Sequence, residues 1–138
     1  MSENKSHIQV VQPEHFLPAK GYSNGVICTG RTLYVAGQIG WDNQGQFTTD
    51  NFAEQFGQAL RNVVDVVRAA GGGPEHLVKM TVYATDVEAY RQSLAAVGAE
   101  WRAIMGRQFP AMALVGVTEL VEPQALVEIE AIASLPNE

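Results

Sequence analysis

Alternating apolar and polar residues near the end of the chain predict a β-strand over residues 125–133. Within it, Val127 and Ile129 alternate with Glu128 and Glu130. Residues two apart share a face of a strand, so the carboxylates lie together, with Cα atoms roughly 7 Å apart, on the face opposite the apolar residues. Exposed carboxylates are common on strands, so the pattern fits both a solvated face and an acid–base site.

Two segments carry apolar residues at helical spacing. The first follows Asn51, which forms a capping-box pattern with Glu54, and it ends at the turn-forming residues 71–74. The second follows Thr85, which forms the same pattern with Glu88. The apolar positions are Phe52, Phe56, Leu60, Val63 and Val67 in the first helix, and Val87, Tyr90, Leu94, Val97, Trp101 and Ile104 in the second.

Short apolar stretches between these helices predict further strands. With the last strand, they cover residues 7–12, 25–29, 32–39, 77–84, 111–117 and 125–133. Gly30 and Arg31 form a tight connection, so we expect the second and third strands to pair as a hairpin. Gly37 predicts a bulge or a close backbone approach. The order β-β-β-α-β-α-β-β predicts an α+β fold with a single mixed sheet and two helices on one face.

The predicted strand at residues 111–117 is apolar on both faces. Met112 and Leu114 share one face, and the Ala and Val residues at the odd-numbered positions share the other. A strand of this kind is usually buried on both sides, and two helices cover only one side of a sheet. The uncovered face is therefore predicted to meet another subunit.

The composition fits one domain spanning residues 1–138, with tails expected at 1–6 and 134–138. The net charge of −6 and the scattered Lys and Arg residues argue against nucleic-acid binding. A single cysteine excludes an intrachain disulfide, and the three histidines lack metal-ligand spacing. No stretch is long enough for a membrane span or has the pattern of a signal peptide, so a cytoplasmic location is predicted.

Four motifs occur at residues 21–25 (GYSNG), 35–39 (VAGQI), 109–111 (FPA) and 127–133 (VEIEAIA). In this order and spacing they resemble the Rid family of enamine/imine deaminases, also called the YjgF/YER057c/UK114 or endoribonuclease L-PSP family. The resemblance implies a chorismate-mutase-like fold and a homotrimer with a central β-barrel and clefts between subunits. It also implies hydrolysis of reactive enamines or imines to carbonyl compounds and ammonia, with neither cofactor nor metal.

The resemblance also implies roles for individual residues. Glu128 matches the carboxylate that orients or activates water, and Tyr22 matches a tyrosine that helps to form the site. For Tyr22, a packed loop anchor is an equal alternative. Glu130 is expected to pair with a neighbouring strand or subunit. Three further residues are expected to border the substrate: Ala36, Gly37 and Gln38; for Gln38 the alternative is hydrogen bonding to backbone groups.

The chain departs from the well-studied deaminase branch at two positions that follow the FPA motif. Met112 and Leu114 stand where that branch carries an arginine, which grips the substrate carboxylate, and a cysteine. A thioether cannot replace a guanidinium fork, and losing its charge-assisted contact costs about 1.5–3 kcal/mol of binding. Either another cation, Arg107 or Arg31, reaches the cleft, or the substrate is larger and more apolar or lacks an α-carboxylate.

The leading functional prediction is therefore hydrolytic deamination of a reactive enamine or imine other than a small 2-imino acid. One alternative is a non-catalytic trimer that binds small molecules or acts as a chaperone. A ribonuclease, as the older family name suggests, is the weaker alternative because the chain lacks a basic stripe.

Overall fold

The computed structural model describes residues 7–138, and its elements follow the predicted order. The strands are β1 (Ile8–Val11), β2 (Gly25–Cys28), β3 (Arg31–Ile39), β4 (Leu77–Ala84), β5 (Ala111–Gly116) and β6 (Val127–Leu135). The helices are α1 (Phe52–Ala69), the short 3₁₀ helix η1 (Pro74–His76), α2 (Val87–Gln92) and α3 (Leu94–Met105). The tail predicted at residues 1–6 lies outside the described residues.

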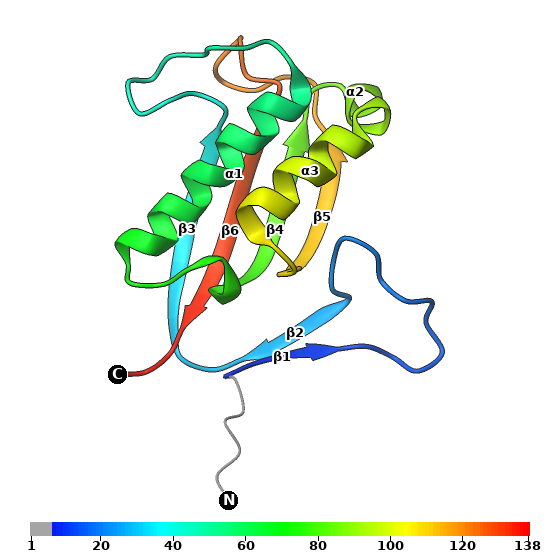
Figure 1. The fold of residues 1–138 in the computed structure, drawn as a ribbon, viewed down its shortest axis with the longest axis vertical. Coiled ribbons are helices and arrows are strands. Elements are labelled where there is room, and N and C mark those ends of the chain that lie inside the picture. The colour runs from blue at the N-terminus through cyan, green and yellow to red at the C-terminus, as the bar shows by residue number, and fades with distance from the viewer. Residues whose placement is uncertain (1–6) are drawn as a thin grey trace, which may run out of the picture.

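Four of the strands form a mixed sheet in the order β3-β6-β4-β5, and α1 and α3 cover one of its faces (Figure 1). Strands β4 and β5 are parallel, whereas β6 runs antiparallel to both of its neighbours. The predicted α+β class is confirmed. The face of the sheet that lies away from α1 and α3 is called the open face below.

The predicted hairpin between the second and third strands is wrong, and so is the single sheet. β2 pairs with β1, and the two form a separate two-stranded ribbon beyond the end of the sheet (Figure 1). The connection at Thr29 explains the difference. Its N–H donates to the carbonyl of His7 at 3.0 Å, and its carbonyl accepts from the Ser134 hydroxyl at 2.8 Å. These bonds hold Thr29 between β1 and the end of β6, so the chain does not fold back along β3.

The other end of the ribbon is held beside β5. Ser23 donates from its N–H to the carbonyl of Pro110 at 3.0 Å and from its hydroxyl to the carbonyl of Phe109. Ser23 also forms an isolated bridge with Ala111. The neighbouring Tyr22 is thereby placed at the edge of the main sheet.

The predicted second helix is divided at Ser93 into α2 and α3. The Ser93 hydroxyl donates to the carbonyl of Ala89 at 2.6 Å, a local bond that competes with regular helix geometry. The cap also differs by one residue, because Asp86 and not Thr85 accepts from the N–H groups of Glu88 and Ala89. The polar side chain one position later has the geometry that the first turn requires.

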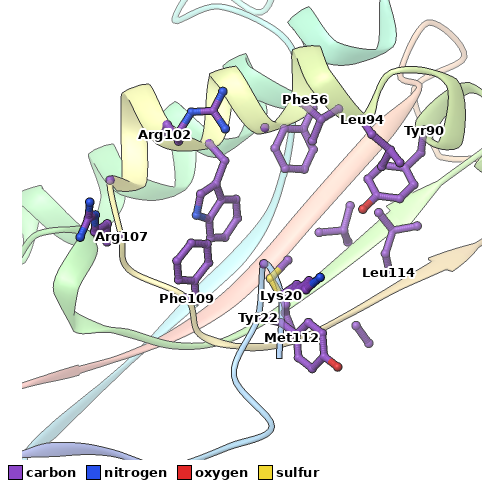
Figure 2. Close-up of a pocket in the computed structure, with 17 residues that line it drawn as sticks. Lys20, Tyr22, Phe56, Tyr90, Leu94, Arg102, Arg107, Phe109, Met112 and Leu114 are labelled. Atoms are coloured by element: carbon purple, nitrogen blue, oxygen red, sulfur yellow. The ribbon is translucent and has the colours of Figure 1, made fainter. Parts of the chain in front are cut away.

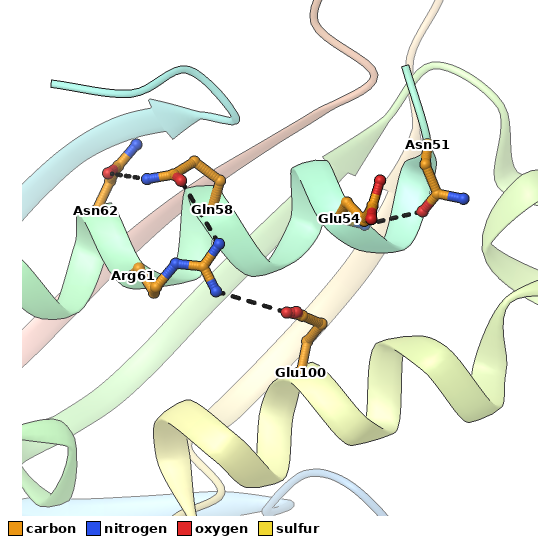
Figure 3. A network of polar contacts seen from close by, with 6 residues as sticks. All are labelled: Asn51, Glu54, Gln58, Arg61, Asn62 and Glu100. Atoms are coloured by element: carbon orange, nitrogen blue, oxygen red, sulfur yellow. Dashed lines mark hydrogen bonds and ion pairs between the residues drawn. The ribbon is translucent and has the colours of Figure 1, made fainter. Parts of the chain in front are cut away.

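Helix α1 begins as predicted, with Asn51 accepting from the Glu54 N–H at 3.0 Å (Figure 3). Only this half of the capping box forms, because the Glu54 carboxylate accepts from Thr49 instead. Arg61 of α1 and Glu100 of α3 approach to 3.5 Å, an exposed pair that contributes little to stability (Figure 3). All five predicted apolar positions of α1 are buried: Phe52, Phe56, Leu60, Val63 and Val67.

Strand β6 runs through the middle of the sheet and buries its apolar face, as predicted. Val127 and Ile129 are fully buried against the helices, and the strand extends beyond the expected end at Ala133. Ser134 and Leu135 were expected in a tail, yet both are buried within β6. The tail is therefore confined to residues 136–138.

Candidate functional site

Most of the predicted site residues fall into two groups on opposite faces of the sheet, whereas Gln38 at the bulge of β3 pairs with the buried Ile129. Met112 lies opposite Met80 in the β4–β5 register, and Met80 is fully buried under the helices. Glu128 lies opposite Tyr83 in the β4–β6 register. Because paired residues share a face and successive residues alternate, Met112 and Glu128 lie on opposite faces. Within one chain, their side chains cannot meet in a single cleft.

On the open face, a β-bulge brings Gly37 against Glu128. The register between β3 and β6 shifts between Val35 and Gln38, so β3 carries one extra residue there. A Cβ atom added at Gly37 would lie 2.8 Å from the Cδ atom of Glu128. The predicted bulge and close approach are both confirmed, and the missing side chain leaves room for a half-buried carboxylate.

Tyr83 is a polar residue of the open face that the sequence analysis missed. Its hydroxyl donates to Oε1 of Glu130 at 2.5 Å. This hydrogen bond raises the pKa of Tyr83, and desolvation and the charges of Glu130 and Glu128 raise it further. Alternation along residues 77–84 could have revealed Tyr83, because Met80 and Val82 mark the opposite, buried face. Glu130 thus pairs with a neighbouring strand, and no described side chain donates a hydrogen bond to Glu128.

Gln38 and Ala36 lie at the same bulge. The Gln38 amide donates to the carbonyl of Ala36 at 3.1 Å. Of the two interpretations left open for Gln38, this contact is the hydrogen bonding of a backbone group.

On the helix side, the other predicted residues line one cavity of about 500 Å³ between α3 and β5, called the α3–β5 cavity below (Figure 2). Tyr22, Met112, Leu114 and Arg107 all contribute to its lining. Arg31, the second cation considered as a substitute for the family arginine, is not among the lining residues and lies at the start of β3 opposite Leu135.

Aromatic residues make up much of the wall of the α3–β5 cavity. Trp101 stacks on Phe109 with ring centroids 6.0 Å apart and an interplanar angle of 7°. The Trp101 indole donates to the carbonyl of Gln108 at 3.2 Å, which fixes the ring. The helical periodicity predicted Trp101 as a buried residue. It could not show that Phe56 and Lys20 also meet at this cavity, because they belong to separate segments.

Metal binding and membrane insertion are two further possibilities for residues 7–138. No group of three His, Cys, Asp or Glu side chains in this range is arranged to hold a metal ion. No helix in the same range has both the length and the apolar character needed to cross a membrane.

Comparison with known proteins identifies the family. Residues 13–135 match the sequence model of the family described as Endoribonuclease L-PSP. The chain is 34% identical over 113 residues to human 2-iminobutanoate/2-iminopropanoate deaminase, covering 81% of this chain and 78% of the human protein. It is 31% identical over 125 residues to a RutC family protein of Aquifex aeolicus, covering 91% of this chain and 97% of that protein. The chain belongs to the Rid family, also called the YjgF/YER057c/UK114 or endoribonuclease L-PSP family.

Solved structures of the family support the same assignment. YyfB of Yersinia pestis, a Rid family protein of unknown function, matches with a TM-score of 0.84 at 34% identity, over 94% of this chain and 99% of that one. RidA of an Antarctic Psychrobacter matches with a TM-score of 0.66 at 29% identity, over 92% of this chain and 99% of that one. The fold expected from the resemblance is confirmed.

Proposed function

We propose that the chain hydrolyses a reactive enamine or imine to a carbonyl compound and ammonia. The observation that carries this proposal is Glu128, a carboxylate in a mostly apolar strand that faces a bulge cleared by Gly37. The family membership supports it, since the human relative is named as an imine deaminase. No metal or cofactor is needed for the reaction proposed.

Water is the nucleophile in this proposal, and Glu128 is the general base. Glu128 accepts a proton as the water oxygen forms a bond to the C=N carbon and gives that proton to the nitrogen, so that a carbinolamine forms. Glu128 then takes the hydroxyl proton and passes it to the amino nitrogen, the C–N bond breaks, and ammonia leaves as the C=O bond forms. An enamine enters the same route after tautomerising to its imine. A carboxylate with no described hydrogen-bond donor from a side chain is available to bind and polarise water, whereas Glu130 is engaged by Tyr83.

We further propose that the reaction site is a cleft between subunits of a homotrimer. In the assembled cleft, one chain supplies Glu128 with Ala36, Gly37 and Gln38. Its neighbour supplies the α3–β5 cavity with Tyr22, Met112, Leu114 and Arg107. The opposite-face placement of the two groups supports this arrangement, because one chain alone cannot bring them together. Tyr22 contributes a hydroxyl that can hydrogen-bond the reacting group.

The substrate proposed is not a small 2-imino acid. Resemblance to the deaminase branch implies an arginine at the position of Met112, and a thioether offers no donor for a carboxylate. Met112 and Leu114 instead widen the apolar lining of the cavity, which favours a larger apolar substrate.

One alternative has an observation in its favour. The α3–β5 cavity is lined mainly by apolar and aromatic residues, with no carboxylate from residues 7–138, which suits a non-catalytic small-molecule-binding or chaperone-like trimer. Ribonuclease action, the activity in the family description, is the weaker alternative because the net charge is −6.

The test is ammonia release from freshly generated imines, some with an α-carboxylate and some without, by the native chain and by Glu128→Gln. Turnover of at least one imine and its loss by about 100-fold or more in Glu128→Gln are expected, in line with the contribution of a general base. Glu130→Gln is the matched control, since it removes a carboxylate two residues away on the same face, and it should keep most of the activity.

Two results would count against the proposal. The first is no release of ammonia from any imine above the rate in buffer, which would favour the binding alternative. The second is equal activity of Glu128→Gln and the native chain, which would remove Glu128 from the chemistry.

A further inference from the structure

The α3–β5 cavity gathers positive charge in an otherwise acidic chain. Among residues 7–138, three cations line it, namely Lys20, Arg102 and Arg107. No Asp or Glu of the same range belongs to the lining. A concave, mostly apolar site with a small number of polar groups is the usual form of a small-molecule site. Here the charged groups of the lining are all positive, which favours anionic ligands.

These three cations are not engaged in holding the fold together. The ion pairs among residues 7–138 are Arg61 with Glu100 and Arg91 with Glu88, both away from the cavity lining. In the same range, no side-chain hydrogen bond is formed by Lys20, Arg102 or Arg107. Each is therefore free to meet the acid group of a ligand.

The three cations lie at different ends of the cavity. In Figure 2, Lys20 is grouped with Tyr22 and Met112 on the strand side, whereas Arg102 and Arg107 lie on the side of Phe109. Lys20 is thus the cation on the segment that is held against β5, the strand that carries Met112. Its position follows from Ser23, whose bonds to Phe109 and Pro110 hold the ribbon against β5.

We propose that the cavity binds an amphipathic acid, with its carboxylate held by Lys20 and a ring or branched apolar body packed against Phe56, Tyr90 and Leu94. A volume of about 500 Å³ lies in the range of cavities that enclose drug-sized ligands, and it exceeds the needs of a molecule of a few carbon atoms. The inference deepens the proposed function, on which it rests for the view that this cavity receives the substrate. The substrate class is then an imine or enamine that carries an apolar ring or branched chain and a carboxylate.

Lysine holds a carboxylate in a different way from the arginine of the deaminase branch. An ammonium group is a point charge on a long flexible stem, so it reaches acid groups at several positions without fixing their orientation. A site with Lys20 and an apolar wall therefore selects for the body of the ligand as well as for its charge.

Binding of unreactive probes tests the inference without any turnover. Isothermal titration calorimetry would compare phenylacetate, its neutral isostere phenylacetamide and acetate on the full chain. The native chain is expected to bind phenylacetate at least about 10-fold more tightly than either of the others, since a charge-assisted contact contributes about 1.5–3 kcal/mol. Lys20→Met should lose that preference over the amide, and Lys20→Arg should restore most of it.

Arg68→Met is the matched control, because Arg68 is an exposed cation of α1 outside the cavity lining, and it should bind like the native chain. Equal binding of phenylacetate and phenylacetamide, absence of phenylacetate binding, or an unchanged preference in Lys20→Met would each overturn the inference. The two proposals fail separately. Loss of ammonia release in Glu128→Gln with phenylacetate binding retained supports both, and turnover of acid-free imines without phenylacetate binding overturns only this inference.

Discussion

Gly37 and Glu128 face each other across the β3–β6 pair, and the glycine leaves the space that the carboxylate occupies. A Cβ atom at Gly37 would stand 2.8 Å from Cδ of Glu128, closer than such atoms approach in folded proteins. The φ angle of Gly37 is not in the positive range that favours glycine, so the backbone alone would accept another residue. Glycine is required at this position because any side chain would collide with the Glu128 carboxylate.

Gly37→Ala should therefore impair ammonia release more than it impairs folding. The Glu128 carboxylate is the far end of a flexible side chain and can move aside, so unfolding free energy should fall by about 1 kcal/mol or less. The same movement takes the carboxylate away from the reacting carbon, and kcat/KM should fall at least about 10-fold. Ammonia release and urea unfolding measure the two effects.

Gly25→Ala provides the control for this substitution. A Cβ atom at Gly25 would be 3.6 Å from its nearest neighbour, Val11 Cβ, which is an ordinary contact. Activity and stability close to native values are expected. Native activity in Gly37→Ala would show that the position of Glu128 does not matter to the reaction.

The hydrogen bond from Tyr83 to Glu130 makes a prediction about alkaline pH. The Glu130 contact, desolvation and the nearby carboxylates raise the pKa of Tyr83, because a tyrosinate at this position would face two negative charges. Its folded-state pKa exceeds its unfolded value, so its contribution to stability is complete below about pH 10 and is lost as pH rises through the folded value. Tyr83→Phe should remove that alkaline loss.

Ultraviolet titration of tyrosinate checks this prediction directly. One of the four tyrosines should titrate above the ordinary range, and Tyr83→Phe should lack that component. Tyr34→Phe, at an exposed position of β3, should retain it. An unchanged high-pH component in Tyr83→Phe would contradict the assignment.

Local patterns in the sequence predicted the elements well, and long-range pairing poorly. The spacing of Phe52, Phe56 and Leu60 has one solution, a helix buried on one side. The hairpin expected around Gly30 does not form, because long-range hydrogen bonds of Thr29 to His7 and Ser134 fix the path of the chain. Ser134 is distant from Thr29 in sequence, so no local sequence pattern predicts the hydrogen bond between them.

For the candidate site, too, the sequence predicted the features that depend on local patterns and missed those that depend on long-range contacts. Alternation in β6 separated Glu128 from the apolar face, and Gly37 was recognised as a point of close approach. The sequence could not show that Lys20 and Met112 line one cavity, because the ribbon that carries Lys20 reaches β5 through Ser23. Nor could it show that Met112 and Glu128 lie on opposite faces, which depends on the register of β4 with both of its neighbours.

Gln55 links helix α1 to the segment that precedes Glu128. The side chain is 1% exposed, and its amide donates to the carbonyls of Thr49 and Gln124 and accepts from the N–H of Leu126. Gln55→Leu would leave buried backbone groups without partners, at a cost of about 1–3 kcal/mol for each group that water cannot reach. Urea unfolding should show a loss of at least about 2 kcal/mol, in agreement with that range.

Gln58→Leu, one turn further along α1, is the comparison for Gln55. Gln58 bonds only to the side chains of Asn62 and Arg61 (Figure 3). No backbone group depends on it, so a change within about 0.5 kcal/mol is expected. Similar losses in the two variants would mean that the Gln55 bonds are not what stabilises this connection.

The last prediction concerns the open face and its part in the assembly of subunits. Val115 is 43% exposed on β5, next to Tyr83 in the sheet register, and no helix covers it. If this face meets other subunits in a trimer, light scattering should give the native protein a mass of about 45 kDa, three times the 14.9 kDa of one chain. Val115→Lys would place an unpaired charge in the interface, and such burial costs several kcal/mol. The variant should run as a smaller species and lose ammonia release while keeping its circular dichroism.

Val121→Lys makes the same change of side chain at a loop position that is 98% exposed, and it should leave both mass and activity unchanged. The comparison matters because the cleft needs two chains. Glu128 and Met112 lie on opposite faces of one sheet. A chain that cannot associate therefore carries both halves of the cleft but cannot bring them together. A native mass of 14.9 kDa with full activity would contradict the shared cleft, and the reaction would then have to use the residues of one face alone.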